Sequence, residues 1–269
     1  MAGSGSLSEA EQRSLVSRLI DPTAPEPLGT YVLRHDRPEA ALALHLERTV
    51  FYEAFGNTPE LLAQEYGPYA DASVLVCVID HQRQVPAGMM RIIVPSAAGL
   101  KSLNDIATIW GGSVEDLYER ASMAYDLEST WDIATLAVAA DYRGAALSGL
   151  VGTGLYQALS VIAARSGVAQ AVAILHLPVL RMMQWKFERP FTLFAGLEPR
   201  RYLDSPASLP VVCEIPSWHR RLRERDETLA GIMCEGTGLE PVIRPPRWDT
   251  AQATFNAVTR LNGPPLRLL

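Results

Sequence analysis

The sequence predicts an α/β fold built on one mixed sheet with helices on both faces. Two apolar strand-like segments, 131–139 and 169–177, are separated by an apolar helical segment at about 147–165. A strand, a crossover helix and a second strand form a parallel pair. Segments 73–80 and 87–95 are joined by a short turn and predict an antiparallel pair. Because apolar strands of this kind are buried on two sides, helices must cover both faces of the sheet.

The remaining elements follow from the spacing of apolar residues and from turn residues. In chain order they are a helix at 8–20, a strand at 29–35, a helix at 38–55, an insertion at 96–130 with helical patches at 100–109 and 113–121, a helix after Pro178, a closing hairpin at 191–196 and 210–216, and a helical patch at 250–261. The chain therefore divides into an N-terminal helical extension (1–28), a central domain (29–226) and a proline-rich extension (227–269) that we expect to pack on that domain.

Composition narrows the classes of function. With 269 residues, of which 48% are hydrophobic, the chain suits one large domain with embellishments. A net charge of −6 argues against a duplex nucleic-acid partner. No apolar run approaches the roughly 20 residues that span a bilayer, and no secretory start is visible, so we expect a cytoplasmic protein. Cys77, Cys213 and Cys234 lie far apart without metal-ligand spacing, so we expect no metal site.

The loop after the strand at 131–139 carries the clearest chemical signal. It opens with Arg143-Gly144 and continues with small residues into the apolar helix. A loop at a helix start offers unpaired N–H groups and the positive end of the helix dipole, which together hold phosphate. The chain has no Gly-Lys-Ser/Thr triplet, and Gly149, Gly152 and Gly154 fall within the helical pattern, which argues against P-loop and dinucleotide sites. The loop therefore predicts a nucleotide-tailed or phosphopantetheine-tailed donor.

The segment Arg143-Gly144-Ala145-Ala146-Leu147-Ser148 resembles the Arg/Gln-x-x-Gly-x-Gly/Ala pyrophosphate loop of the Gcn5-related N-acetyltransferase (GNAT) superfamily. Ala146 and Ser148 stand in place of small glycines. The resemblance implies a GNAT-like fold whose fourth and fifth strands splay apart, and an acyl-CoA or acyl-carrier-protein co-substrate with no permanently bound cofactor. The donor-binding residues that it implies are Leu136, Ala137, Val138, Arg143, Gly144, Ala145, Ala146, Leu147, Ser148 and Gly149.

The insertion at 96–130 is similar to one in acyl-homoserine lactone synthases and N-acyl amino acid synthases. Further marks of that resemblance are Arg48-Thr-Val-Phe51, the acidic region 65–71, Gly88-x-x-Arg91 before Pro95, and Leu127-Glu128-Ser129. Thr130 and Trp131 occupy the places of an Arg and an aromatic residue. This departure argues against lactone formation and leaves long-chain acyl transfer to an amine.

Acyl transfer to an amine needs a base for the ammonium proton. Glu128, just before the fourth strand, is the predicted base, and Asp132 is the alternate. Arg91 lies on an apolar strand, where an unpaired charge is costly, so we expect it to pair with Glu128 or with a carboxylate of the acceptor; a purely structural ion pair is the other interpretation. His176 is a candidate proton shuttle or a core histidine, and Trp131 is a candidate substrate contact.

These observations predict an N-acyltransferase that moves an acyl group from acyl-CoA or acyl-carrier protein to the primary amine of a small molecule or amino acid. Direct attack in a ternary complex is expected, because no cysteine lies near the motif. Two alternatives stay open. One is an aminoacyl-tRNA-dependent transferase of the same fold, and the other is a non-catalytic module that binds acyl-CoA or another small molecule.

Overall fold

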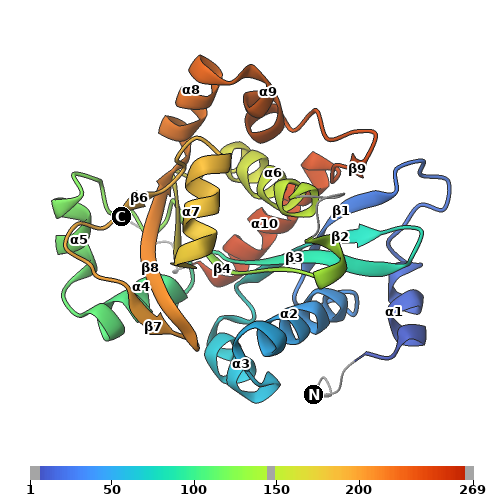
Figure 1. The fold of residues 1–269 in the computed structure, drawn as a ribbon, viewed down its shortest axis with the longest axis horizontal. Helices are drawn as coiled ribbons and strands as arrows, with labels where there is room; N and C mark the ends of the chain where they lie inside the picture. Colours follow the sequence, from blue (N-terminus) through green and yellow to red (C-terminus); the bar gives the residue numbers. More distant parts are fainter. Residues whose placement is uncertain (1–6, 144–148, 264–269) are drawn as a thin grey trace.

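The computed structural model describes residues 7–143 and 149–263, within which nine strands form one sheet (Figure 1). The order is β6-β8-β5-β4-β3-β2-β1-β9, and β7 pairs with β8 outside this path. The strands are β1 (Leu28–Arg34), β2 (Ser73–Asp80), β3 (Val85–Ile93), β4 (Thr130–Val138), β5 (Gln170–His176), β6 (Thr192–Leu193), β7 (Arg200–Tyr202), β8 (Ser205–Glu214) and β9 (Ile243–Arg244). The β4–β5 and β1–β9 pairs are parallel and the β1–β2, β2–β3, β3–β4 and β5–β8 pairs are antiparallel, which confirms the predicted mixed sheet.

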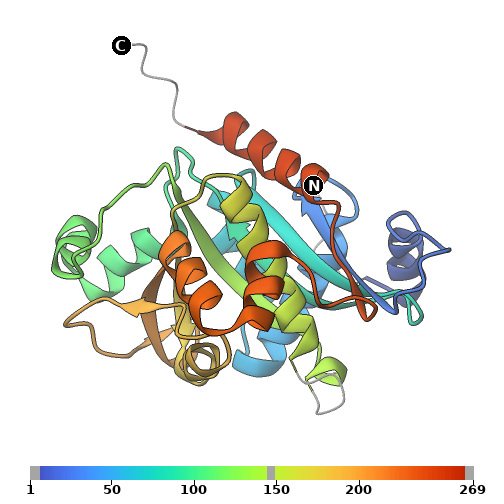
Figure 2. The same cartoon turned by 90° about the horizontal axis from the view of Figure 1, so that it is seen from above.

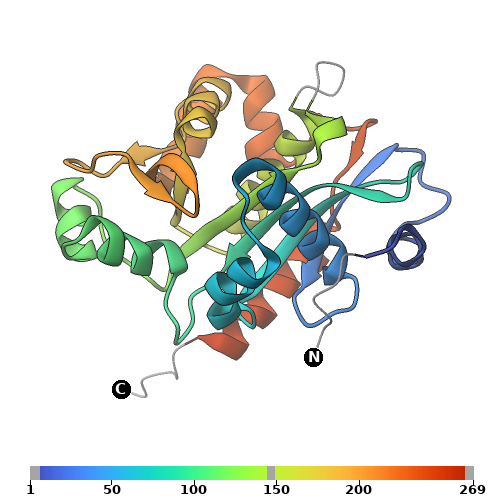
Figure 3. The ribbon, with the colours of Figure 1, turned by 60° about the horizontal axis from the view of Figure 1, so that its bottom comes forward.

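Helices cover both faces of this sheet. They are α1 (Glu9–Val16), α2 (Ala40–Phe55), α3 (Pro59–Tyr66), α4 (Lys101–Asp105), α5 (Val114–Arg120), α6 (Leu150–Arg165), α7 (Leu177–Lys186), α8 (Ile215–Arg225), α9 (Glu227–Ala230) and α10 (Trp248–Asn262). Helices α2 and α3 lie across one face (Figure 3), and α6, α8 and α10 lie on the other (Figures 1 and 2). None of the helices in the described ranges has the length and apolar composition needed to cross a membrane.

Strand β2 shows why both faces are covered. Its side chains alternate between the two faces, as in any strand. Val74, Val76 and Val78 belong to the core that includes α6 and α10, whereas Leu75 and Cys77 belong to the smaller core under α2. All five side chains are fully buried. The apolar run thus contributes side chains to both cores.

The insertion and the C-terminal segment both make defined contacts with the domain. The insertion forms α4, one turn of π-helix (Ile106–Trp110) and α5, and the indole N–H of Trp110 donates to the carbonyl of Glu198 (2.8 Å). At the C-terminus, α10 packs Phe255 onto Trp131 of β4, with ring centroids 4.3 Å apart and nearly parallel planes. Trp131 is 3% exposed. It therefore packs in the core between β4 and α10, and its contact with substrate stays a prediction.

Candidate active site

Strands β4 and β5 are paired at one end and part at the other. Parallel pairing covers three residue pairs, from Thr130↔Gln170 to Asp132↔Val172, and no ladder joins the rest of these two strands, both of which lie within the described ranges. Beyond that level β4 pairs only with β3, and β5 only with β8. The two strands therefore form a fork that opens toward Val138 and His176, as the predicted splay requires.

A β-bulge in β4 lies where the fork begins. Arg91 of β3 pairs with Thr135 and Ile92 pairs with Ile133, so Ala134 is the extra residue. Bulges bend a strand and end its regular pairing. The β4 backbone beyond the bulge has β3 on one side and the fork on the other. Its amide and carbonyl groups on the fork side can pair with an extended ligand as a neighbouring strand would.

Leu136, Ala137 and Val138, which were predicted to bind the donor, form this part of β4. The side chains of Leu136 and Val138 are half-buried and pack toward the α6 face, whereas Ala137 is buried under α2. Their backbone groups, rather than their side chains, are thus what the fork offers to a ligand.

The open end of the fork leads to the start of α6. The Arg143 side chain folds back, and its Nε donates to the carbonyl of Val138 (2.7 Å). The preceding turn is fixed by a hydrogen bond from the Tyr142 hydroxyl to Asp80 (2.7 Å) and by the Arg83–Asp141 ion pair (2.8 Å). The predicted loop residues Gly144, Ala145, Ala146, Leu147 and Ser148 lie outside the described residues.

Gly149 precedes α6 with a left-handed φ of 78°, which favours glycine, and no side chain of the described residues caps the helix there. Its carbonyl accepts a hydrogen bond from Lys186 Nζ of α7 (3.1 Å). Partial burial lowers the pKa of the Lys186 ammonium. The first turn of α6, Arg143 and Lys186 together supply N–H groups and cations at the end of the fork, which suits a phosphate group. Sequence reasoning missed Lys186 because it lies 37 residues beyond Gly149.

Arg91 is paired with a partner that the sequence analysis did not name. Its Nε and Nη2 donate to the two carboxylate oxygens of Glu47 on α2, at 3.0 and 2.5 Å. Thr135 donates to the same carboxylate at 2.5 Å, and the Tyr66 ring lies 4.9 Å below the guanidinium. Burial opposes the charged form of Arg91, but the charge of Glu47 outweighs it, and the pKa of the guanidinium is raised. The predicted Arg91–Glu128 ion pair is wrong, and Arg91 forms a buried structural pair.

A second buried cation lies beside this pair. Lys101 of α4 is 2% exposed, and its ammonium contacts Glu65 (2.7 Å) and Asp105 (2.5 Å). It also lies 5.2 Å from the Tyr66 ring and donates to the Tyr202 hydroxyl (3.1 Å). Burial lowers the pKa of Lys101, but the hydrogen bonds to Asp105 and Glu65 raise it by more than burial lowers it. The pKa of Lys101 is therefore raised overall. The ammonium is thus held charged between α3, α4 and β7.

The two candidate bases occupy different environments. Asp132 is fully buried at the last paired residue of β4, and it accepts hydrogen bonds from the backbone N–H (2.6 Å) and the hydroxyl (2.7 Å) of Ser102. Burial raises the pKa of its carboxyl to about 6, against the two bonds from Ser102. Glu128 is exposed in the loop before β4. Glu128 lies two residues before Thr130, at the closed end of the fork. The open end of the fork is at Val138, and at a strand rise of about 3.3 Å per residue it is about 26 Å from Thr130.

His176 ends β5 at the open side of the fork. Its Nδ1 is 2.8 Å from the Ser205 hydroxyl, and its ring meets the Phe55 ring edge-on at 5.7 Å. The side chain is half-buried. His176 therefore lies where α2 approaches the fork, in a position open to contact with an incoming molecule.

Comparisons of the whole chain with known proteins show which solved structures share this fold. No family model and no curated sequence matches the chain. Among solved structures, FeeM, an N-acyl amino acid synthase from uncultured soil microbes, covers 72% of this chain and 93% of its own at 14% identity, with a TM-score of 0.52. BjaI, a CoA-dependent acyl-homoserine lactone synthase solved with SAM and isopentyl-CoA, covers 86% and 98% at 17% identity, also with a TM-score of 0.52. The chain has the GNAT-like fold of these two synthases. The resemblance predicted from the sequence is therefore confirmed at the level of the fold.

Within the described residues, no cluster of three or more His, Cys, Asp or Glu side chains is arranged to hold a metal ion. The polar side chains described near the fork, such as Arg91, Lys101 and Asp132, instead form ion pairs and hydrogen bonds within the protein. At the fork, the backbone edge of β4 and the cations Arg143 and Lys186 near the start of α6 are the groups that a ligand could contact.

Proposed function

We propose that the protein transfers an acyl group from a phosphopantetheine thioester, as acyl-CoA or acyl-carrier protein, to the primary amine of a small molecule. The observation that carries this proposal is the fork, in which a bulged β4 with a free backbone edge leads to the uncapped start of α6. An extended pantetheine arm has amide groups that can pair with that edge. Its phosphate end then meets the N–H groups of α6 and the side chains of Arg143 and Lys186.

In this proposal the amine nitrogen attacks the thioester carbonyl carbon directly. The new C–N bond forms, the C–S bond breaks, and the leaving sulfur takes the second proton released by the nitrogen, so that the donor leaves as a free thiol. One proton of the attacking ammonium passes to a base, so that the neutral amine is the nucleophile. The fold shared with FeeM, an N-acyl amino acid synthase, and BjaI, a CoA-dependent acyl-homoserine lactone synthase, supports this reaction class.

For the base, we propose Asp132 in preference to Glu128. Asp132 lies at the level where the strands part, whereas Glu128 lies in the loop beyond their paired end. A pKa of about 6 leaves the Asp132 carboxyl mostly ionised at pH 7 and close to the value that suits a general base there. The Ser102 hydroxyl, which donates to this carboxylate, provides a route for the proton.

The reaction itself is tested by thiol release from acyl-CoA in the presence of a panel of amines. Release that depends on the amine, with formation of the amide, is the expected result. Tight CoA binding without turnover would instead indicate a binding module, and turnover only with charged tRNA would overturn the donor assignment.

The base is tested with D132N, E128Q and S102A. D132N should lower kcat at least 100-fold and remove the acidic limb of the pH profile near pH 6. S102A removes the hydroxyl bond to Asp132 but keeps the carboxylate and the backbone N–H bond from α4, so it should lower kcat less than D132N does. If E128Q abolishes turnover while D132N does not, the base is Glu128 and our assignment is wrong.

A further inference from the structure

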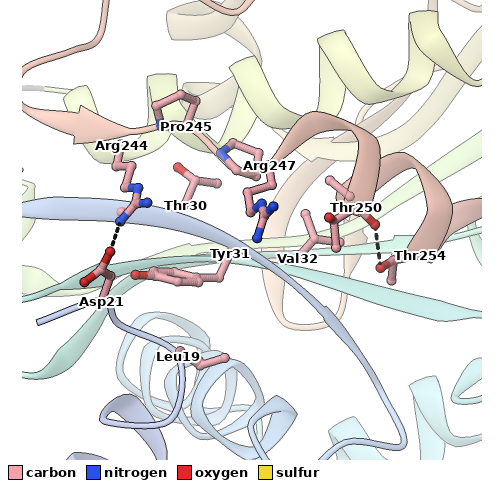
Figure 4. Close-up of a pocket in the computed structure, with 13 residues that line it drawn as sticks. Leu19, Asp21, Thr30, Tyr31, Val32, Arg244, Pro245, Arg247, Thr250 and Thr254 are labelled. Atoms are coloured by element: carbon pink, nitrogen blue, oxygen red, sulfur yellow. Dashed lines mark hydrogen bonds and ion pairs between the residues drawn. The ribbon is translucent and has the colours of Figure 1, made fainter. Parts of the chain in front are cut away.

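A cavity of about 360 Å³ lies at the far edge of the sheet, between β1 and the C-terminal segment (Figure 4). Its floor is β1 from Gly29 to Val32, and its other walls are Leu19, the turn 244–247 and the first turns of α10. Three strand spacings of about 4.8 Å separate β1 from β4 along the sheet order, so the cavity is about 14 Å from the fork. It is therefore a separate site.

The sequence of the C-terminal segment, with two consecutive prolines after β9, explains why the cavity exists. Strand β9 pairs with β1 only at Leu28↔Ile243 and Gly29↔Arg244. Pro245 and Pro246 follow at once, and because proline has no N–H it cannot continue the ladder. The chain leaves the sheet here and begins α10 at Trp248. The β1 edge beyond Gly29 consequently faces open space instead of a strand.

Two guanidinium groups border this space. Arg247 is exposed, and within the described ranges its guanidinium makes no hydrogen bond or ion pair. Figure 4 shows its guanidinium extending into the cavity above Tyr31. Arg244 is 40% exposed and is 3.7 Å from the Asp21 carboxylate, too far for a hydrogen bond. Two cations against one carboxylate leave the cavity positive, although the chain as a whole has a net charge of −6.

The walls between these cations are largely apolar. The Tyr31 ring, Val32 and Pro246 present carbon surface, and Thr250 lies on the first turn of α10. No side chain caps α10, whose N-cap is Arg247 itself. A cavity of this volume is at the lower end of the range for small-molecule sites, about 300–1,000 Å³. Its chemistry fits a molecule with one anionic end and one apolar end.

We propose that this cavity binds a small organic anion, with a carboxylate or phosphate group held by Arg247 and Arg244 and an apolar body against Tyr31 and Pro246. A guanidinium binds either oxyanion with two parallel hydrogen bonds. Because the Arg247 guanidinium has no ion-pair partner among residues 7–143 and 149–263, an anion binding there displaces none of those residues. The site is independent of the acyl-transfer proposal.

The test is calorimetric titration of the full chain, without acyl donor, with benzoate, phenyl phosphate and inorganic phosphate. We expect benzoate or phenyl phosphate to bind at a one-to-one ratio. Inorganic phosphate should bind at least tenfold more weakly than that organic anion, because it lacks an apolar body. R247Q should weaken binding about tenfold or more, as expected for the loss of a charge-assisted contact. R220Q is the matched control, because Arg220 is an exposed arginine of α8 that makes no ion pair in the described part of the chain.

A second variant, V32F, fills the cavity while keeping both arginines, and it should abolish binding with the circular-dichroism spectrum unchanged. Equal affinities of R247Q and R220Q would overturn the proposal, as would unchanged binding to V32F. Binding of inorganic phosphate as tight as that of phenyl phosphate would overturn the apolar half of the ligand. Absence of binding by all three probes would overturn the site.

Discussion

Replacing Glu47 by Gln tests the buried pair that joins α2 to the sheet. The side chains of Arg91 and Glu47 are 5% and 2% exposed, so Arg91 cannot turn to solvent when its carboxylate partner is lost. The variant keeps the shape of the side chain but leaves a buried guanidinium without a counter-charge. Breaking a buried pair in this way costs about 3–5 kcal/mol. For a chain of this size that loss lowers Tm by about 6 °C or more.

The assay is urea unfolding followed by circular dichroism, with two reference variants. E9Q removes the exposed Glu9–Arg13 pair, whose side chains are 85% and 61% exposed, and should change the free energy of unfolding by no more than about 0.5 kcal/mol. The double variant E47L/R91M replaces the buried pair with apolar side chains and should recover most of the loss, because it removes both charges together.

Two results would refute this reasoning. A loss below about 1 kcal/mol in E47Q would show that Arg91 finds water or another partner. A double variant as unstable as E47Q would show that α2 depends on the Glu47 hydrogen bonds themselves and not on charge compensation.

Three further predictions concern the fork and its surroundings. K186A should weaken CoA binding about tenfold in a titration, whereas R220Q should not. The D132N variant should lose a pH dependence of stability: because burial raises the folded-state pKa of Asp132 to about 6, above its unfolded value, wild-type stability should fall as pH rises from about 4 to 6, and thermal melts of the two proteins should converge toward low pH. W131L should lower stability by about 2 kcal/mol or more through loss of the stack on α10, with KM for the acyl donor unchanged.

Much of the fold could be predicted because its signals are local. The continuous apolar run in 73–80 and the crossover between 131–139 and 169–177 each depend on a few consecutive residues. Strand β9 could not be predicted, because two residues between prolines carry no periodic pattern and are held only by pairing with β1. The cavity beside it was invisible for the same reason.

The side-chain network of the site was harder to predict, since its contacts join residues far apart in the chain. Arg91 and Glu47 are separated by 44 positions, and Asp132 and Ser102 by 30. One local signal did exist. Glu47 lies on α2 among the buried residues Ala43, Leu46 and Val50, so a carboxylate occurs on the apolar face of that helix. A buried carboxylate demands a cation, and Arg91 was the charged residue already noted on an apolar strand.

The insertion is bonded to the part of the sheet where the fork begins. Ser102 of α4 holds Asp132 at the last paired residue of β4, and the neighbouring Lys101 is held by Glu65 and Asp105 beneath the Tyr66 ring that also contacts Arg91. A shift of α4 would therefore change the hydrogen bonds of Asp132, and with them its pKa. Because S102A removes one of the two bonds that lower this pKa, the acidic limb of the rate profile should move upward in that variant if Asp132 is the base. An unchanged acidic limb would show that the bond between the insertion and Asp132 does not affect the group that limits the rate.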